Sequence, residues 1–161
     1  MDVNKFHSLP QQGKGVNIFS QFGQIPVPVK TLQTVFARRP TIAVVGLSPK
    51  RHRPSHQVAR YLLDAGYTLI PVNPGQDRIL DLPCYPNLLS IRESVDVVDI
   101  FRRADQVLPI VQDGVSIGAK VIWMQQGIVN EEAAELARQA GLAVVMDRCI
   151  KIEHGRFMAE H

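Results

Sequence analysis

Five short apolar runs, separated by helical stretches, constrain the fold of this chain more than any other feature. The runs are TIAVVG from residue 41, YTLIPV from residue 67, VDVVDIF from residue 95, KVIWM from residue 120 and LAVVM from residue 142. They lack the regular alternation of apolar and polar residues, which is typical of strands buried on both faces. Helical patterns occupy residues 55–66, 106–118 and 131–141. Together they predict an α/β fold in three layers, a Rossmann-like, doubly wound parallel sheet of about five strands.

Residues 1–30 differ from the rest of the chain. They mix glycine and proline with polar residues and show no sustained periodicity, so we expect an extended N-terminal arm ahead of a single domain at residues 31–161. A short helix is expected at residues 32–38, before Pro40. A free tail would not need the apolar residues of the arm, so we expect it to lie on the main body or on a second subunit. The second arrangement would make the protein a homo-oligomer.

The composition favours a cytoplasmic protein that binds neither nucleic acid nor a membrane. The net charge is +3, and basic residues are spread along the chain except at residues 50–53 and 102–103, whereas nucleic-acid binding needs a basic face. No apolar run approaches the roughly 18 residues that a spanning helix needs, and the first residues lack the order of a signal peptide. The two cysteines suit a reducing compartment, and their spacing predicts no metal site.

The ends of the predicted strands place the candidate site. In an open parallel sheet, ligands bind outside the carboxyl ends of the strands. Most polar residues that a core does not explain lie at these ends, which are residues 46–53, 73–74, 101–103, 125–127 and 147–149.

The first of these ends excludes the usual dinucleotide fingerprint. NAD binding needs G-x-G-x-x-G after the first strand and an acidic residue after the second. This chain has G-x-S-x-x-R, from Gly46 to Arg51, and its second strand ends in Asn73 and Pro74. The loop also lacks the glycine, lysine and serine or threonine sequence that ends a P-loop. An NAD(P)-binding regulator of the redox-sensing kind is therefore kept only as an alternative.

The same loop favours a ligand with more phosphate charge than NAD. A helix N-terminus offers free backbone amides, and hydroxyl groups and cations surround it: Ser48, Lys50, Arg51, Arg53 and Ser55. Because Asn73 is neutral, it would not repel such a ligand as an aspartate would.

Several separated motifs also carry a resemblance to a known family. They are VVGLSPKRHRPSHQVARYLLDAGYTLIPVNP, VDVVDIFRRADQVLPIV, KVIWMQQGI and VVMDRCIKIEH, in that order, over residues 35–156. This chain resembles the small bacterial and archaeal CoA-binding proteins, which are similar to the N-terminal CoA-binding domain of the succinyl-CoA synthetase α subunit.

The resemblance implies a fold that binds coenzyme A, or an acyl-CoA, without a glycine-rich NAD fingerprint. It assigns the phosphates to the first loop, the adenosine to the end of the second strand, and the pantetheine path to the ends of the third and fourth. The implied residues are Gly46, Ser48, Lys50, Arg53, Val72, Asn73, Pro74, Phe101, Arg102, Gln125 and Gly127.

Nothing in the sequence predicts a catalytic centre. The resemblance implies that catalysis in the synthetases uses a histidine on a further domain and a partner with a nucleotide-grasp fold. We therefore expect a CoA-binding protein that is not catalytic alone. The alternatives are a subunit of an acyl-CoA ligase or transferase that needs a partner, and a scaffold whose pocket is vestigial.

Cys149 is a further candidate at the last strand end. A helix N-terminus and the adjacent Arg148 favour a thiolate there, and coenzyme A itself ends in a thiol. A mixed disulfide between Cys149 and coenzyme A is one hypothesis, and a buried or capping cysteine is the other.

Overall fold

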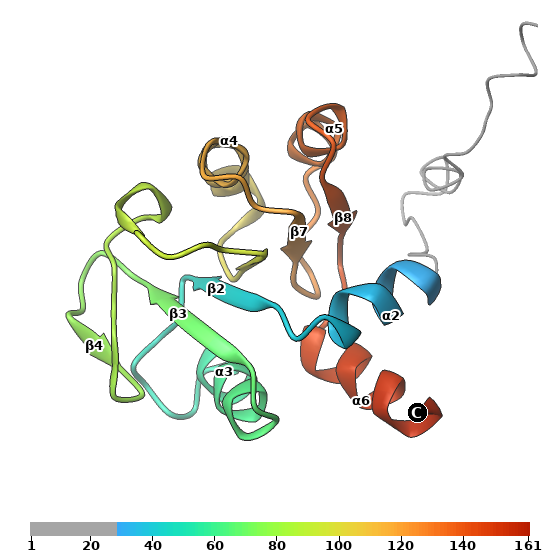
Figure 1. The fold of residues 1–161 in the computed structure, drawn as a ribbon. Coiled ribbons are helices and arrows are strands. Elements are labelled where there is room, and N and C mark those ends of the chain that lie inside the picture. Colours follow the sequence, from blue (N-terminus) through green and yellow to red (C-terminus); the bar gives the residue numbers. More distant parts are fainter. Residues whose placement is uncertain (1–28) are drawn as a thin grey trace, which may run out of the picture.

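The computed structural model describes residues 29–161, and its centre is one parallel sheet (Figure 1). The strands lie in the order β3-β2-β6-β7-β8, and every neighbouring pair is parallel. Their bounds are β2 Thr41–Val45, β3 Thr68–Val72, β6 Val97–Ile100, β7 Val121–Met124 and β8 Ala143–Val145. The predicted Rossmann-like α/β fold with a five-stranded parallel sheet is confirmed.

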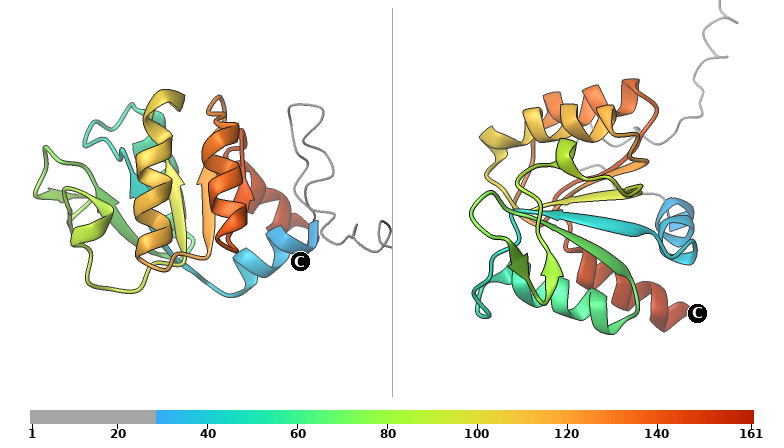
Figure 2. Two further views of the ribbon diagram at one scale, coloured as in Figure 1. Left: turned by 90° about the horizontal axis from the view of Figure 1, so that it is seen from above. Right: turned by 60° about the vertical axis from the view of Figure 1, so that its left-hand side comes forward.

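Helices cover both faces of this sheet, which gives three layers (Figure 2). Helices α4 and α5 pack on one face, and α3 and α6 pack on the other, where α2 joins them. Their bounds are α2 Val29–Ala37, α3 Pro54–Asp64, α4 Val107–Ser116, α5 Glu131–Gln139 and α6 Ile150–Glu160. Within residues 29–161, every helix is too short or too polar to span a membrane.

Burial on both faces explains the continuous apolar runs. Successive strand residues point to opposite sides, so Ala43 and Val45 pack under α4 and α5, while Ile42 and Val44 pack under the other helices. Both faces of the strand are therefore buried in the core. A polar residue at every second position, as in a strand with one exposed face, would here be shut away from solvent.

The connection between β3 and β6 is irregular, as its sequence indicates. It holds a hairpin of β4 (Arg78–Ile79) and β5 (Leu82–Pro83), followed by a 3-10 helix at Leu88–Ser90. At the other end of the chain, α2 begins at Val29, earlier than the helix expected at residue 32. The rest of the predicted arm, residues 1–28, lies outside the described residues.

A buried histidine joins the helices on one face of the sheet. His154 of α6 is almost fully buried, and its Nδ1 lies 2.8 Å from the hydroxyl of Tyr61 on α3. Its ring also meets Phe36 of α2 edge-on, at 5.2 Å between centroids. Burial lowers the pKa of His154, so the neutral imidazole is the form that packs here. This cluster holds α6 against α2 and α3.

Asp99 is the least expected residue of the sheet. It lies in the middle of β6, opposite Val44 of β2 and Trp123 of β7, and it is fully buried. Neither carboxylate oxygen has a hydrogen-bond partner among residues 29–161. Burial raises the pKa of Asp99 well above its ordinary value, because an unpaired buried carboxylate is costly.

Asp99→Asn should change how stability depends on pH. Because its pKa is raised by burial, Asp99 keeps its proton to a higher pH in the folded protein than in the unfolded chain, so wild-type stability falls as pH rises above the unfolded pKa. The slope for one such proton is about 1.4 kcal/mol per pH unit. Because Asn cannot ionise, the variant should match the wild type near pH 4 and exceed it increasingly as the pH rises towards the raised pKa of folded Asp99, as measured by urea unfolding.

The exposed Asp64 provides the control for this series. Asp64→Asn should follow the wild-type dependence on pH. Parallel curves for wild type and Asp99→Asn would contradict a protonated Asp99.

Candidate functional site

A cleft of about 900 Å³ lies at the carboxyl ends of the central strands. Nine residues that the sequence predicted line it: Gly46, Ser48, Arg53, Asn73, Pro74, Phe101, Arg102, Gln125 and Cys149. Three others do not line it, namely Lys50, which is exposed, Val72, which is buried in the core, and Gly127. The structure thus brings most of the predicted site together.

The end of β2 touches the end of β6 at a glycine. Gly46 has a φ of +89°, and a Cβ placed there would lie 2.4 Å from the carbonyl oxygen of Phe101. Its amide donates to the carbonyl of Val72 at the end of β3. Only glycine allows both the left-handed turn and this close approach.

Backbone-to-hydroxyl bonds shape the loop between β2 and α3. The Ser48 amide donates to Ser55 Oγ at 2.9 Å, and the Lys50 amide donates to Ser48 Oγ at 3.1 Å. His56 Nδ1 lies 2.9 Å from the Ser48 carbonyl, so this nitrogen carries the proton. Two amides that the sequence left free for a phosphate are therefore used within the loop. Each serine keeps its own hydroxyl proton to donate.

Asn73 connects the ends of β2 and β3. Its Nδ2 donates to the carbonyl of Leu47 at 2.9 Å, and its Oδ1 accepts from the amide of Gly75 at 2.8 Å. The side chain therefore holds the two loops together and forms part of the cleft wall.

Arginines bring positive charge to the half of the cleft beside the start of α3 and the end of β6. Arg53 directly precedes α3 and makes no side-chain capping bond, while Arg102 and Arg103 follow β6. Arg103 pairs with the exposed Asp105 at 3.3 Å. All three arginines line the cleft, and none of its lining residues in the described part of the chain is acidic.

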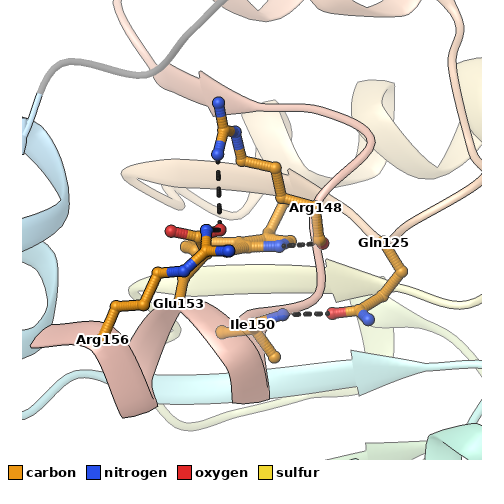
Figure 3. Close-up of polar contacts among 6 residues, drawn as sticks. Gln125, Arg148, Ile150, Glu153 and Arg156 are labelled. Carbon is orange, nitrogen blue, oxygen red and sulfur yellow. Dashed lines mark hydrogen bonds and ion pairs between the residues drawn. The ribbon is translucent and has the colours of Figure 1, made fainter.

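The other half of the cleft lies beside the start of α6, whose polar contacts Figure 3 shows. Gln125, which is buried, accepts a hydrogen bond from the Ile150 amide at 3.1 Å and so satisfies the first turn of the helix. Cys149 is the N-cap residue, and its side chain makes no capping bond. Cys149 lines the cleft, and the mixed disulfide with coenzyme A stays a prediction.

Sequence reasoning missed part of the lining. Val58 and Ile128 supply apolar wall; the sequence placed Val58 within a helical stretch and did not single out Ile128. The lining is completed by Pro54, Ser55, Arg103 and Gln126. The signal for Val58 was its place in the first turns of the helix that follows the loop. Residues 29–161 contain no cluster of acidic, histidine and cysteine side chains that could hold a metal ion.

Gly46→Ala should destabilise the protein beyond the ordinary cost of a positive φ. Alanine in the left-handed region costs about 1–2 kcal/mol, and at position 46 its Cβ would also press on the Phe101 carbonyl. Gly141→Ala is the matched control, since Gly141 has a φ of +90° and open space around its Cβ position. Equal losses in chemical denaturation would contradict the close contact.

Comparison with known proteins places this architecture among CoA-binding domains. A family described as "CoA binding domain" matches residues 40–155. An uncharacterized protein of Bacillus subtilis, YneT, is 41% identical over 123 residues, which cover 76% of this chain and 91% of that protein. A hypothetical protein from Pyrococcus horikoshii has a solved structure with a TM-score of 0.80 and 37% identity, covering 82% of this chain and 93% of that one.

A larger enzyme also shares this domain. The ADP-forming acetate–CoA ligase I of Archaeoglobus fulgidus is 29% identical over 119 residues, which cover 68% of this chain. This chain spans only 17% of the ligase. The similarity therefore concerns one region of that enzyme.

Proposed function

Because the chain belongs to the CoA-binding domain family, we propose that it binds coenzyme A or an acyl-CoA in the cleft and is not catalytic alone. The observation that carries this proposal is the charge of the lining, which has three arginines and no acidic residue among the described residues. Coenzyme A carries both a pyrophosphate and a 3′-phosphate, and guanidinium groups bind phosphates well.

The phosphates would lie at the end of the cleft between β2 and β6. Arg53 and Arg102 line that end, and the Ser48 and Ser55 hydroxyls can donate there while accepting backbone bonds. The start of α3 adds the partial positive charge of a helix N-terminus. The charge of the arginines, the serine hydroxyl donors and the dipole of α3 all support placing the phosphates at this end of the cleft.

The pantetheine arm would run across the end of β6 towards β7. Phe101, Val58 and Ile128 supply apolar wall along this path, and Gln125 and Gln126 supply amides. A mixture of apolar wall and few polar groups suits a chain of methylenes and amides. The thiol would then come to rest near Cys149.

The same features argue against NAD as the ligand. NAD needs an acidic residue for its ribose hydroxyls. Asn73 stands at the end of β3 instead, and both the nitrogen and the oxygen of its side-chain amide are hydrogen-bonded within the protein. Within the described residues, none of the cleft lining can take the acidic role.

Thermal unfolding with matched concentrations of coenzyme A, dephospho-CoA, NAD and NADP tests the proposal. A ligand at 100 times its dissociation constant adds about 2.7 kcal/mol of stability. Coenzyme A should raise the melting temperature most, and dephospho-CoA should raise it less. Stabilisation by NAD or NADP alone would favour the redox-sensing alternative, and no shift with any of them would contradict the proposal.

Arginine variants identify which cation binds the 3′-phosphate. Arg53→Gln and Arg102→Gln should each weaken coenzyme A binding about tenfold, since a charge-assisted hydrogen bond is worth roughly 1.5–3 kcal/mol. The variant that removes the 3′-phosphate contact should bind dephospho-CoA as the wild type does. Arg60→Gln, at an exposed position of α3 outside the cleft lining, is the control and should leave both affinities unchanged.

A further inference from the structure

A second cavity, of about 220 Å³, lies beyond Cys149 between the end of β8 and the first turns of α6. Cys149 and Gln126 line both this cavity and the main cleft. The two spaces are therefore neighbours. They meet on the β7 and β8 side of the sheet, away from the loop at residues 46–53 that follows β2.

Two arginines and one buried glutamate form a wall of the second cavity (Figure 3). Glu153 is only 7% exposed, and its Oε2 accepts hydrogen bonds from Arg148 Nη1 at 3.3 Å and from Arg156 Nη1 at 2.9 Å. The buried carboxylate holds both guanidinium groups in place from one side. Preorganised donors of this kind bind a ligand without first paying for their own ordering.

Most hydrogen-bond donors of these arginines are still available. A guanidinium has five N–H groups, and each arginine spends one of them on Glu153 within the described residues. The other carboxylate at the cavity, Asp147, accepts a bond from the Gly127 amide at 2.7 Å. The N-terminus of α6 adds partial positive charge. The two carboxylates offset the charges of the two arginines, so the cavity offers an acceptor-rich, anionic group its unused N–H donors and the partial charge of the helix terminus.

The volume of the second cavity and its position beside Cys149 indicate the source of this anionic group. A water occupies about 30 Å³ in the liquid, so 220 Å³ suits a group of about seven non-hydrogen atoms. If the phosphates of coenzyme A lie at the arginine-rich end of the cleft, its thiol end lies beside Cys149, at the entrance to this cavity. An acyl group on that thiol would enter it.

From this geometry we propose that the second cavity is an acyl site, and that it selects short acyl groups that end in a carboxylate. The proposal rests on the CoA-binding function proposed above. The terminal carboxylate binds the free N–H groups of Arg148 and Arg156, as a bidentate or bridging pair. An acyl group that ends in a methyl would bury these donors without a partner, which is costly.

Calorimetric titration with coenzyme A, butyryl-CoA and succinyl-CoA tests this proposal. The two thioesters carry four acyl carbons each and differ in the terminal carboxylate. Succinyl-CoA should bind about tenfold more tightly than butyryl-CoA, because only its carboxylate can accept hydrogen bonds from the unused N–H groups of the arginines. Equal affinities would overturn the proposal.

Variants of the two arginines assign the effect to this cavity. Arg156→Gln and Arg148→Gln should each remove most of the preference for succinyl-CoA while leaving the affinity for coenzyme A unchanged, since neither residue lines the main cleft. Arg60→Gln should keep the preference. Thermal unfolding without ligand checks that each variant folds, and Arg156 is the safer change because it is 64% exposed and leaves Glu153 paired with Arg148.

The outcomes separate the two proposals. If coenzyme A binds but the wild type shows no preference between the thioesters, the acyl site fails and the CoA-binding function stands. If neither coenzyme A nor a thioester binds, the CoA-binding function fails and the acyl site fails with it. A loss of affinity for all three ligands in Arg156→Gln would place that arginine against coenzyme A itself and would overturn the acyl site.

Discussion

The backbone contact between Gly46 and Phe101 decides the shape of the cleft, because it brings the ends of β2 and β6 together with no side chain between them. The chain then leaves β2 in a left-handed turn, at a φ of +89°, and the following loop lies over the ends of the neighbouring strands. Arg102 comes directly after the contact. A side chain at position 46 would push the two strand ends apart and would separate the loop from the arginines.

The second fixed point of the cleft is the start of α6. Gln125 reaches from the end of β7 to the Ile150 amide, so a buried amide side chain replaces the capping bond that Cys149 does not make. His154 holds the same helix against α2 and α3 about one turn further along. These contacts place Cys149 and the Arg148–Glu153–Arg156 group opposite the basic loop. Arginines therefore line both the main cleft and the second cavity, which suits the long ligand proposed above, with phosphates at one end and a carboxylate at the other.

Much of this arrangement could be predicted from the sequence, because parallel strands bring their carboxyl ends to one edge of a sheet. Gly46, Asn73, Phe101 and Gln125 could each be assigned to that edge from the position of the apolar run before it. What each side chain does there could not be predicted. Asn73 and Gln125 look like ligand contacts in sequence, yet they spend bonds on the backbone of distant segments.

The residues that the sequence could not interpret depend on contacts between distant elements. Asp99 interrupts an apolar run, and only the register of β6 between β2 and β7 shows that it is fully buried without a partner. The sequence assigns no role to Glu153, and only the packing of α6 shows that it is buried and paired with two arginines. Local pattern cannot report such burial, because it arises from the way the layers stack.

A crystal structure of the protein grown with coenzyme A tests the central claim most directly. The account predicts electron density for the pyrophosphate and 3′-phosphate beside Ser48, Arg53 and Arg102, and for the thiol beside Cys149. Density for the phosphates at the α6 end of the cleft, or for coenzyme A bound outside the cleft, would contradict it.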